Sequence, residues 1–598
     1  MTQSSKTTLT AGPPESKPLD PVLLEVIRNA LASVTDEMAM TIFRTARSAI
    51  VKDLLDFSVA LCDRHGRMVG QGLSLPLQLC AIPKALSYLR RHFGDSLVEG
   101  DLVVMNDPYE GGLHLPDVFV FRPIFVDGAL FAYAVTVAHQ TDIGGRVAGS
   151  NATDSTEIYQ EGLRIPFLKL YEAGRPNETF FRLIEKNVRL PIKVIGDLHA
   201  QAAACSIGAR HLDRLVKEYG NDRLEAYLEG LLDYSERVAR AQIAGWPDGA
   251  YEFEDFIDDD GTNDSPVRIA VHMVISGDQI RVDFAGSAPQ VKAAINCPIA
   301  VTESVVYSAV RSVMNADIPN NEGFFRPITV TAPERSIVNL AYPAACAGRG
   351  LTAYRVMDVM LGVLAQAVPD RVPAAAEGGI QLITIGGYDQ DNRPFIVVDV
   401  ACGTGGARPT KDGIDGIGNL VANMANTPIE LEERESPVLV REYGYVPDSG
   451  GAGRFRGGLA LVRSLELREP SALANLRSDR RRFAPWGLAG GGEGGRSSNL
   501  LTRDGLTTVL PTKCAVELKR GDIVSLITPG GGGYGDAFSR APEAVAKDVV
   551  DGKVSVQHAR RAYGVVLDAA GLVDREATAD LRAKSGLEPC GLGHPPAV

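Results

Sequence analysis

The sequence predicts a multi-domain protein of the mixed α/β (α+β) class, with largely antiparallel and mixed sheets and helices packed against them. Residues 21–50 carry apolar side chains at i, i+3, i+4 and i+7, the spacing of an amphipathic helix. From residue 247 apolar and polar residues alternate as in strands, and from about 375 to 535 glycine-rich turns separate short apolar runs. The 598 residues, of which 45% are hydrophobic, suffice for roughly two to four domains.

Changes in this texture along the chain predict five segments. They are a disordered leader (1–20), an N-terminal α/β domain (21–245), an α+β middle domain (246–375), a glycine-rich β-dominated domain (376–540) and a helical tail (541–598). Within them the patterns predict, in chain order, a helix over 21–50 broken near 33–35, a hairpin turning at 63–66, a helix within 79–95, strands within 101–145, helices over 180–245 and helical stretches at 300–315 and 352–367.

Composition excludes several classes of function. The net charge of −13 and the pI of about 5.3 oppose binding to nucleic acid or to an anionic membrane surface. No apolar stretch approaches the roughly 20 residues that span a bilayer. The leader lacks the basic-then-apolar layout of a signal peptide, and the eight cysteines are scattered without a CxxC pair. We therefore expect a soluble cytoplasmic protein with reduced thiols.

Two His-x-x-Asp units are the strongest candidates for chemistry. His114 and Asp117 precede one predicted strand, and His139 and Asp142 follow the next. If these strands form an antiparallel hairpin through the turn at Asp127, the start of one faces the end of the other. Two imidazoles and two carboxylates would then converge on a divalent ion such as Mn, Fe or Zn.

The same residues have a plainer interpretation. A histidine near a strand end is often a surface or hydrogen-bonded residue, and a single His-x-x-Asp unit is a weak pattern. Asp56 and Asp53, which precede the strand that begins near Phe57, could add ligands, although Asp53 better fits a solvated helix end.

Other motifs are less specific. The glycine-rich segments 403–413 and 528–536 could cradle an anion but more often mark tight turns. No GxxxxGK[ST] phosphate loop is present, so the sequence offers no evident ATP site. The basic stretch 477–482 suits a local anion or a subunit contact rather than nucleic acid. Cys297 and Cys346 could be nucleophiles, but buried structural thiols are the commoner case.

With these motifs in place, the chain resembles the hydantoinase B/oxoprolinase family from about residue 20 to 565. The blocks that carry the resemblance are RTARSAIVKDLLDFSVALCDRHGRMVGQG, NDPYEGGLHLPDV, AHQTDIGG, QEGLRIP, GTGGARPTKDGIDG, ERESPVLVREYGYVPDSGGAGRFRGG, FAPWGLAGG, LKRGDIVSLITPGGGGYGD and DVVDGKVSVQHARRAYGVV. Agreement over so many ordered blocks is far more specific than any single motif.

The resemblance implies a division of labour between two subunits. A partner of the hydantoinase A type, an actin-like ATPase that holds ATP and Mg, phosphorylates the substrate, and this chain converts it. The family includes ATP-dependent hydantoinases, 5-oxoprolinases and lactamases, as well as acetone and acetophenone carboxylases. Its metal site maps onto Asp56, His114, Asp117, His139 and Asp142. The expected complex is a hetero-oligomer that acts on a small cyclic amide or a ketone.

The sequence also departs from the family pattern. Ser74 and Gln78 stand where relatives often carry histidine, and Arg164 replaces a histidine that the carboxylases have in the QEGxxIP block. These changes favour cyclic-amide hydrolysis over ketone carboxylation, while a non-catalytic scaffold for the ATPase remains the third alternative. For hydrolysis the candidate catalytic residues are Asp56, Asp142 and Arg164. One of Asp56, Asp117 and Asp142 would act as a base or orient a histidine. The planar guanidinium of Arg164 could hold a phosphate or carboxylate, and a structural salt bridge is an equally good interpretation of it.

Overall fold

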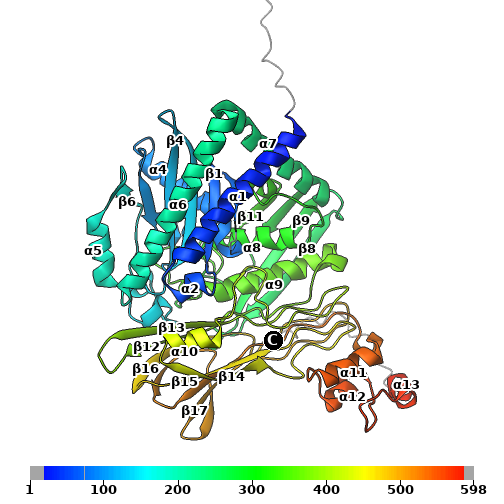
Figure 1. Cartoon of the computed structure of the whole chain (residues 1–598). Helices are drawn as coiled ribbons and strands as arrows, with labels where there is room; N and C mark the ends of the chain where they lie inside the picture. The colour runs from blue at the N-terminus through cyan, green and yellow to red at the C-terminus, as the bar shows by residue number, and fades with distance from the viewer. Residues whose placement is uncertain (1–18, 73–74, 585–598) are drawn as a thin grey trace, which may run out of the picture.

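The computed structural model describes residues 19–72 and 75–584, so most of the predicted leader and Ser74 lie outside the described residues. It confirms the predicted fold class, with four largely antiparallel sheets in the described chain. Two sheets and their helices form the upper part in Figure 1, and two further sheets lie below them. The short helices α11 (Pro542–Val550), α12 (Val556–Tyr563) and α13 (Arg575–Lys584) sit beside the lower sheets.

The first sheet is antiparallel throughout. Its strand order is β2-β1-β5-β4-β3-β6-β7. The strands are β1 (Phe57–Asp63), β2 (Met68–Gln71), β3 (Leu102–Met105), β4 (Asp117–Val126), β5 (Ala129–His139), β6 (Leu168–Glu172) and β7 (Arg175–Pro176). The hairpins predicted at 63–66 and at Asp127 are both present.

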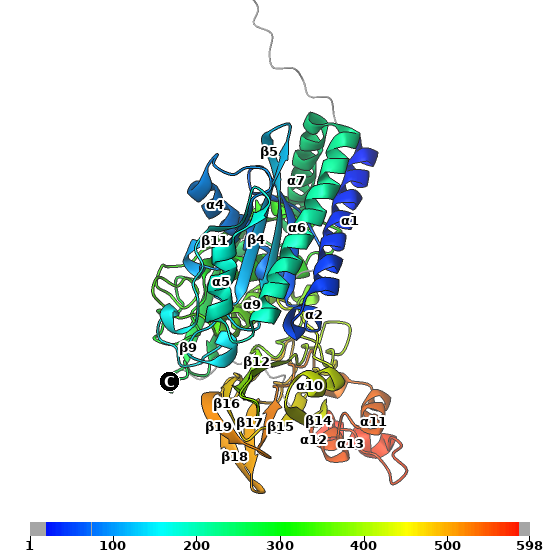
Figure 2. The ribbon, with the colours of Figure 1, turned by 60° about the vertical axis from the view of Figure 1, so that its left-hand side comes forward.

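Long helices cover one face of this sheet. Helices α1 (Pro21–Thr45) and α6 (Pro191–Tyr219) pack together on it, with α7 (Asn221–Ile243) beside them (Figure 2). The remaining helices of this half of the chain are α2 (Ala49–Lys52), α3 (Pro76–Leu79), α4 (Ile82–Phe93) and α5 (Glu178–Asn187).

The predicted break in the first helix was wrong. Helix α1 runs through Val34 and Thr35, which are buried, and the Thr35 hydroxyl donates to main-chain carbonyls of the preceding turn. The interruption falls later, where the Asp197 carboxylate accepts the main-chain N–H groups of Arg47 and Ser48. Burial of the helix face thus outweighs the weak helix propensity of a Ser-Val-Thr run.

The second sheet and two helices share a core with the other face of the first sheet. Its order is β11-β10-β9-β8, and only β10 and β11 run parallel. The elements are β8 (Gly249–Ile257), β9 (Val267–Ser276), β10 (Gln279–Asp283), β11 (Ile328–Thr331), α8 (Ile299–Ser312) and α9 (Arg349–Ala367). One hydrophobic cluster joins side chains on both sides of residue 246, so the texture change there marks a new sheet within a continuous core.

The lower half holds the two remaining sheets, β13-β12-β16-β19 and β14-β15-β20-β17-β18. Their strands are β12 (Gln381–Tyr388), β13 (Pro394–Ala401), β14 (Val438–Tyr445), β15 (Leu461–Leu467), β16 (Ser471–Arg477), β17 (Ser498–Arg503), β18 (Leu506–Leu510), β19 (Lys513–Lys519) and β20 (Ile523–Ile527), and α10 (Ile429–Glu435) precedes β14. The glycine-rich segments pack backbone against backbone: a Cβ on Gly457 would lie 1.9 Å from the carbonyl oxygen of Gly531. The glycines therefore allow the main chains of these segments to approach each other closely.

Two general expectations can be compared with the structure. The seven described cysteines are free, whereas Cys590 lies outside the described residues. Among the described helices, none has both the length and the apolar composition that a membrane crossing requires.

A buried ion network ties the halves of the molecule together. The Arg480 guanidinium, which has no exposed surface, pairs with Asp255 on β8 at 2.9 Å and with Asp358 on α9. Nearby, Arg355 pairs with Asp255 and Asp479. Each buried charge here has a partner, and loss of one partner would leave the other uncompensated.

We expect Arg480→Gln to lower the free energy of unfolding by about 3–5 kcal/mol, because it leaves the buried Asp358 carboxylate without its ion-pair partner. Urea denaturation of the full chain measures this value. Arg482→Gln is the matched control. Among the described residues Arg482 forms an ion pair only with the exposed Asp264, and loss of this pair should cost no more than about 0.5 kcal/mol. Equal effects of the two changes would contradict the structural role of the network.

Candidate metal site

Three neighbouring strands, β1, β5 and β4, place polar side chains in one row at one end of the strands of the first sheet. Asp117, at the start of β4, lies directly opposite His139, at the end of β5. Asp56 immediately precedes β1, and its carbonyl accepts the main-chain N–H of His139. His114 reaches the same point from the loop before β4. The antiparallel register therefore gathers residues that lie far apart in the sequence.

His114, Asp117 and His139 form a tight group whose ligand atoms face one another. His114 Nε2 lies 3.1 Å from His139 Nδ1 and 3.4 Å from Asp117 Oδ1, and His139 Nδ1 lies 3.2 Å from Asp117 Oδ1. The three residues are at most 6% exposed.

These separations fit the ligands of a single cation. A circle through three points at these distances has a radius of about 1.9 Å. Zinc bonds to imidazole nitrogen are roughly 2.0–2.1 Å long, so an ion about 1 Å above the plane of the three atoms would reach all of them. Two imidazoles and one carboxylate are also a donor set that Zn, Mn and Fe accept.

The surroundings of the group keep its members in the protonation states that metal binding requires. His114 Nδ1 lies 3.2 Å from the carbonyl oxygen of Ala347, and only a protonated nitrogen can donate there, so Nε2 presents its lone pair to the group. Burial, and then the charge of Arg349, lowers the pKa of His114 to about 3, which keeps the ring neutral. Burial alone would raise the pKa of Asp117, but Arg349 and the two imidazoles hold it well below its usual range.

Asp56 lies at the margin of the group. Its Oδ2 is 3.7 Å from His139 Nδ1, and its Oδ1 accepts a hydrogen bond of 2.6 Å from the Gln78 side chain. Burial raises the pKa of Asp56 to about 6. Gln78 thus orients one carboxylate oxygen and leaves the other facing the histidines. Asp53, the residue that follows α2 and caps it, is partly exposed, as expected for a solvated helix end.

The structure does not bring Asp142 into the group. Its carboxylate accepts the Arg189 guanidinium at 2.9 Å and the main-chain N–H groups of Arg189 at 2.7 Å and Gly149 at 3.1 Å. The His-x-x-Asp spacing misled the sequence interpretation here because the chain turns after β5 to form a loop. Asp142 stabilises that loop instead.

Arg164 is also outside the cavity at this group. Its Nε lies 3.5 Å from Asp107, and its guanidinium lies over the rings of Tyr109, Tyr159 and Tyr342. The two candidate nucleophiles are fully buried, and burial raises the pKa of the Cys297 thiol to about 12 and that of Cys346 well above its usual value. Both thiols therefore keep their protons at neutral pH.

Sequence reasoning did not link four residues around the group to the site. Arg349, the first residue of α9, pairs with Asp117 through the carboxylate oxygen that faces away from the histidines. Arg477 and Tyr354 line the cavity, and Glu161 accepts the main-chain N–H groups of Cys346 and Ala347. These residues lie outside the His-x-x-Asp units and most are far along the chain, so no local spacing could have linked them to the site. The available local signals were two short triplets that place a charged residue beside glycine, QEG at 160–162 and GRG at 348–350.

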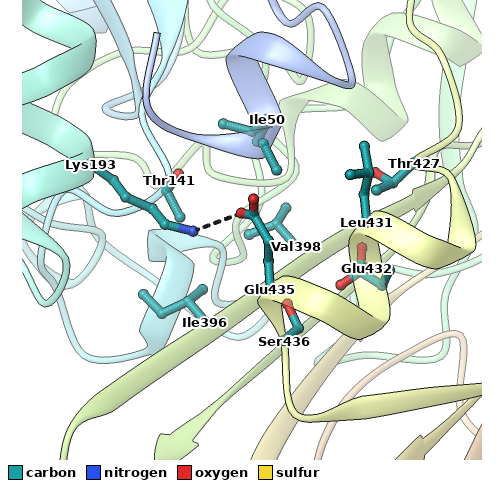
Figure 3. A pocket seen from close by; sticks show the side chains of 11 residues that line it. Ile50, Thr141, Lys193, Ile396, Val398, Thr427, Leu431, Glu432, Glu435 and Ser436 are labelled. Carbon is teal, nitrogen blue, oxygen red and sulfur yellow. Dashed lines mark hydrogen bonds and ion pairs between the residues drawn. The ribbon is translucent and has the colours of Figure 1, made fainter.

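A small cavity of about 40 Å³ opens at this group, space for a few water molecules. A second cavity of about 30 Å³ lies at the contact between the upper and lower sheets (Figure 3). Ile50 lines both cavities. In the second, Lys193 reaches across to Glu435 at 3.4 Å, so an ion pair spans the space between α6 and α10.

Fold and donor set together define a mixed α/β protein with a buried His/Asp group that could hold a metal. The chain belongs to the hydantoinase B/oxoprolinase family, whose sequence profile matches residues 20–537. The resemblance inferred from the motifs is thereby confirmed.

Relatives with named activities include two bacterial enzyme components. The chain is 33% identical to the B component of a putative D-/L-hydantoinase from Pseudomonas sp. (strain NS671), over 95% of this chain and 98% of that protein. It is 34% identical to the β component of the caprolactamase from Pseudomonas jessenii, over 94% of this chain and 99% of that protein. Both relatives are named as subunits.

Two solved structures share the fold. The ATP-dependent caprolactamase from Pseudomonas jessenii matches with a TM-score of 0.89 and 33% identity, over 95% of this chain and 100% of that chain. Nucleotide-free acetone carboxylase matches with a TM-score of 0.89 and 19% identity, over 95% of this chain and 83% of that chain. At 19% identity the second likeness is one of fold.

We expect Glu161, which binds the loop beside His114, to make the free energy of unfolding depend on pH. Burial raises the pKa of Glu161 from 4.5 to about 8. Between these values the folded chain binds more protons at this carboxyl than the unfolded chain, so its contribution to stability is lost as the pH rises. We expect the stability of the wild type relative to Glu161→Gln to fall by on the order of 3 kcal/mol between about pH 5 and about pH 8. If the curves of unfolding free energy against pH ran parallel for the wild type and Glu161→Gln, this expectation would be contradicted.

Proposed function

We propose that this chain is the metal-dependent catalytic subunit of an ATP-dependent cyclic-amide hydrolase of the hydantoin, oxoproline or lactam type. The observation that carries the proposal is the buried group of His114, Asp117 and His139, whose separations fit one divalent ion. The match along nearly the whole length of a hydantoinase component and a caprolactamase component supports the substrate class.

The chemistry explains why ATP is needed. Resonance stabilises an amide against attack by water at neutral pH. Transfer of the terminal phosphoryl group of ATP to the amide oxygen would give an imidyl phosphate. One water molecule then adds to the ring carbon, the carbon–nitrogen bond breaks with its electron pair and a proton passing to nitrogen, and an acyl phosphate with a free amine results. A second water molecule releases the carboxylate and inorganic phosphate.

The residues of this chain would have distinct roles. His114 Nε2, His139 Nδ1 and Asp117 Oδ1 would hold the ion, and Arg349 would fix the Asp117 carboxylate in the required orientation. A divalent ion held by these residues would lower the pKa of water and so would make hydroxide available at neutral pH. Asp56 Oδ2, with its raised pKa and its partner Gln78, suits the acceptor of a proton beside His139.

The phosphorylating step would belong to a partner protein. This sequence has no phosphate loop, and its glycine-rich segments pack against one another. Both bacterial relatives are named as single components of larger enzymes, which supports a hetero-oligomer. We propose an ATPase of the hydantoinase A type as that partner, with ATP and Mg bound to it.

The first test compares substrates in the purified complex of both subunits. Cyclic amides should trigger release of ADP and phosphate together with ring opening, and bicarbonate should have no effect. His139→Ala should abolish ring opening and weaken metal retention by more than the roughly 10–100-fold that loss of a supporting hydrogen bond costs. His65→Ala, at the exposed turn of the first hairpin, is the matched control and should change neither.

Two outcomes would overturn the proposal. ATP consumption that requires a ketone and bicarbonate would assign the complex to the carboxylases. Full turnover in both His114→Ala and His139→Ala would make this chain a scaffold for its partner. Metal content, measured by mass spectrometry of dialysed protein, separates loss of the ion from loss of a catalytic group.

A further inference from the structure

Arg477 is a buried cation that the proposed catalytic roles do not use. It is the last residue of β16, lies opposite Leu382 of β12 and Lys513 of β19, and is 4% exposed. Its side chain lines the cavity that His114 and His139 also line. The lower sheets thereby contribute a positive charge to a site that the upper sheet builds.

Arg477 has no carboxylate partner among the residues that the structure describes. Its Nη1 donates to the carbonyl oxygen of Ala347 at 2.8 Å and to the Asn151 side chain at 3.4 Å, and its buried Nε has no hydrogen-bond acceptor among the described residues. Other buried arginines differ in this respect: Arg349 pairs with Asp117, and Arg463 pairs with Asp399.

Glu161 is a carboxyl group whose charge would favour the charged form of Arg477, but no ion pair joins the two side chains in the described part of the chain. Glu161 turns its oxygens to the main-chain N–H groups of Cys346 and Ala347, and burial raises its pKa to about 8, so it is largely protonated at neutral pH. Burial, followed by repulsion from Arg349, lowers the pKa of Arg477 to about 10. Arg477 therefore stays charged at neutral pH but is held in an unfavourable environment.

A buried charge without a partner destabilises a fold by several kcal/mol, which favours a neutral side chain unless a ligand completes the pair. The charge balance around the cavity points the same way. Arg349 and Arg477 offset Asp56 and Asp117, so a divalent ion would leave two positive charges in excess. A phosphoryl group carries about −1.5 to −2 at neutral pH.

We propose that Arg477 forms, with the cavity beside His114 and His139, a binding subsite for the phosphoryl group of the activated substrate. The inference rests on the proposed function and adds the residue that recognises the activated form. A guanidinium presents two parallel N–H groups to a phosphate, a geometry that an ammonium group cannot match. Tyr354, which also lines the cavity, adds a hydroxyl donor, because burial keeps its pKa well above the usual value.

This subsite explains the basic stretch at 477–482. Arg480 in that stretch is saturated by Asp255 and Asp358, and Arg482 lies at the surface. Of the four arginines in the stretch, Arg477 alone lines the cavity. The phosphate-holding role expected of Arg164 therefore passes to Arg477, since Arg164 pairs with Asp107 away from this cavity.

The test is a titration of the metal-loaded complex with inorganic phosphate, followed by thermal unfolding and calorimetry. Phosphate should raise the unfolding temperature more than chloride at equal ionic strength, and acetate should bind at least roughly tenfold more weakly. Arg477→Met should weaken phosphate binding roughly 10-fold or more, while Arg477→Lys, which keeps the charge without the fork, should be intermediate. Arg482→Gln is the matched control and should bind phosphate as the wild type does.

A second readout separates binding from structure. Without phosphate, Arg477→Met should unfold at the same temperature as the wild type or higher, because it removes an uncompensated charge. A large destabilisation with unchanged phosphate affinity, or equal affinities for phosphate and acetate, would overturn the subsite. Ring opening without Arg477-dependent phosphate binding would overturn the subsite alone. Arg477-dependent binding without turnover of any cyclic amide would support the subsite and leave the proposed reaction wrong.

Discussion

The register of one antiparallel hairpin is the constraint on which the site depends. Asp117 stands opposite His139, and Asp56 continues the row on the next strand. A shift of the strand register by one residue would turn one of these side chains to the other face of the sheet, and the ligand atoms would no longer lie together. The register is fixed because successive side chains of β4 and β5 point to opposite faces of the sheet and are buried in a hydrophobic core on each face. The chemistry is therefore built into the core of the upper half.

The second feature is the way the molecule distributes buried charge. Around Arg480 and Arg355, positive and negative groups are matched, and the network joins β8, α9 and the segment after β16. At the cavity, by contrast, Arg477 is left unmatched within the described part of the chain. The matched network is understood as a structural connection between sheets, and the unmatched cation as a place for an anion. The basic stretch at 477–482 supplies Arg480 to the network and Arg477 to the cavity.

Much of this could be predicted from sequence, for a physical reason. Asp117 and His139 lie on the two strands of one hairpin and His114 lies in the loop just before it, so a period-two pattern and a turn signal suffice to bring them together. The fold class and the order of helices and strands followed from similar local patterns. Asp142 was misplaced because spacing alone does not show that the chain leaves the strand direction after His139, where Arg189 captures the carboxylate.

The remaining contributions depend on contacts between distant segments. Arg349 and Arg477 reach the site from much further along the chain, and no local pattern encodes that approach. The helix break was misjudged because packing of α1 on α6 outweighs local propensity. The glycine-rich segments had two interpretations, and contacts such as that between Gly457 and Gly531 support the packing one.

The central claim is tested most directly by a crystal structure of the chain grown with Mn²⁺ or Zn²⁺ and measured at the absorption edge of that metal. The account predicts one strong anomalous peak roughly 2.0–2.3 Å from His114 Nε2, His139 Nδ1 and Asp117 Oδ1. A map with no peak between these three atoms, or with the ion bound at Asp142 instead, would contradict it.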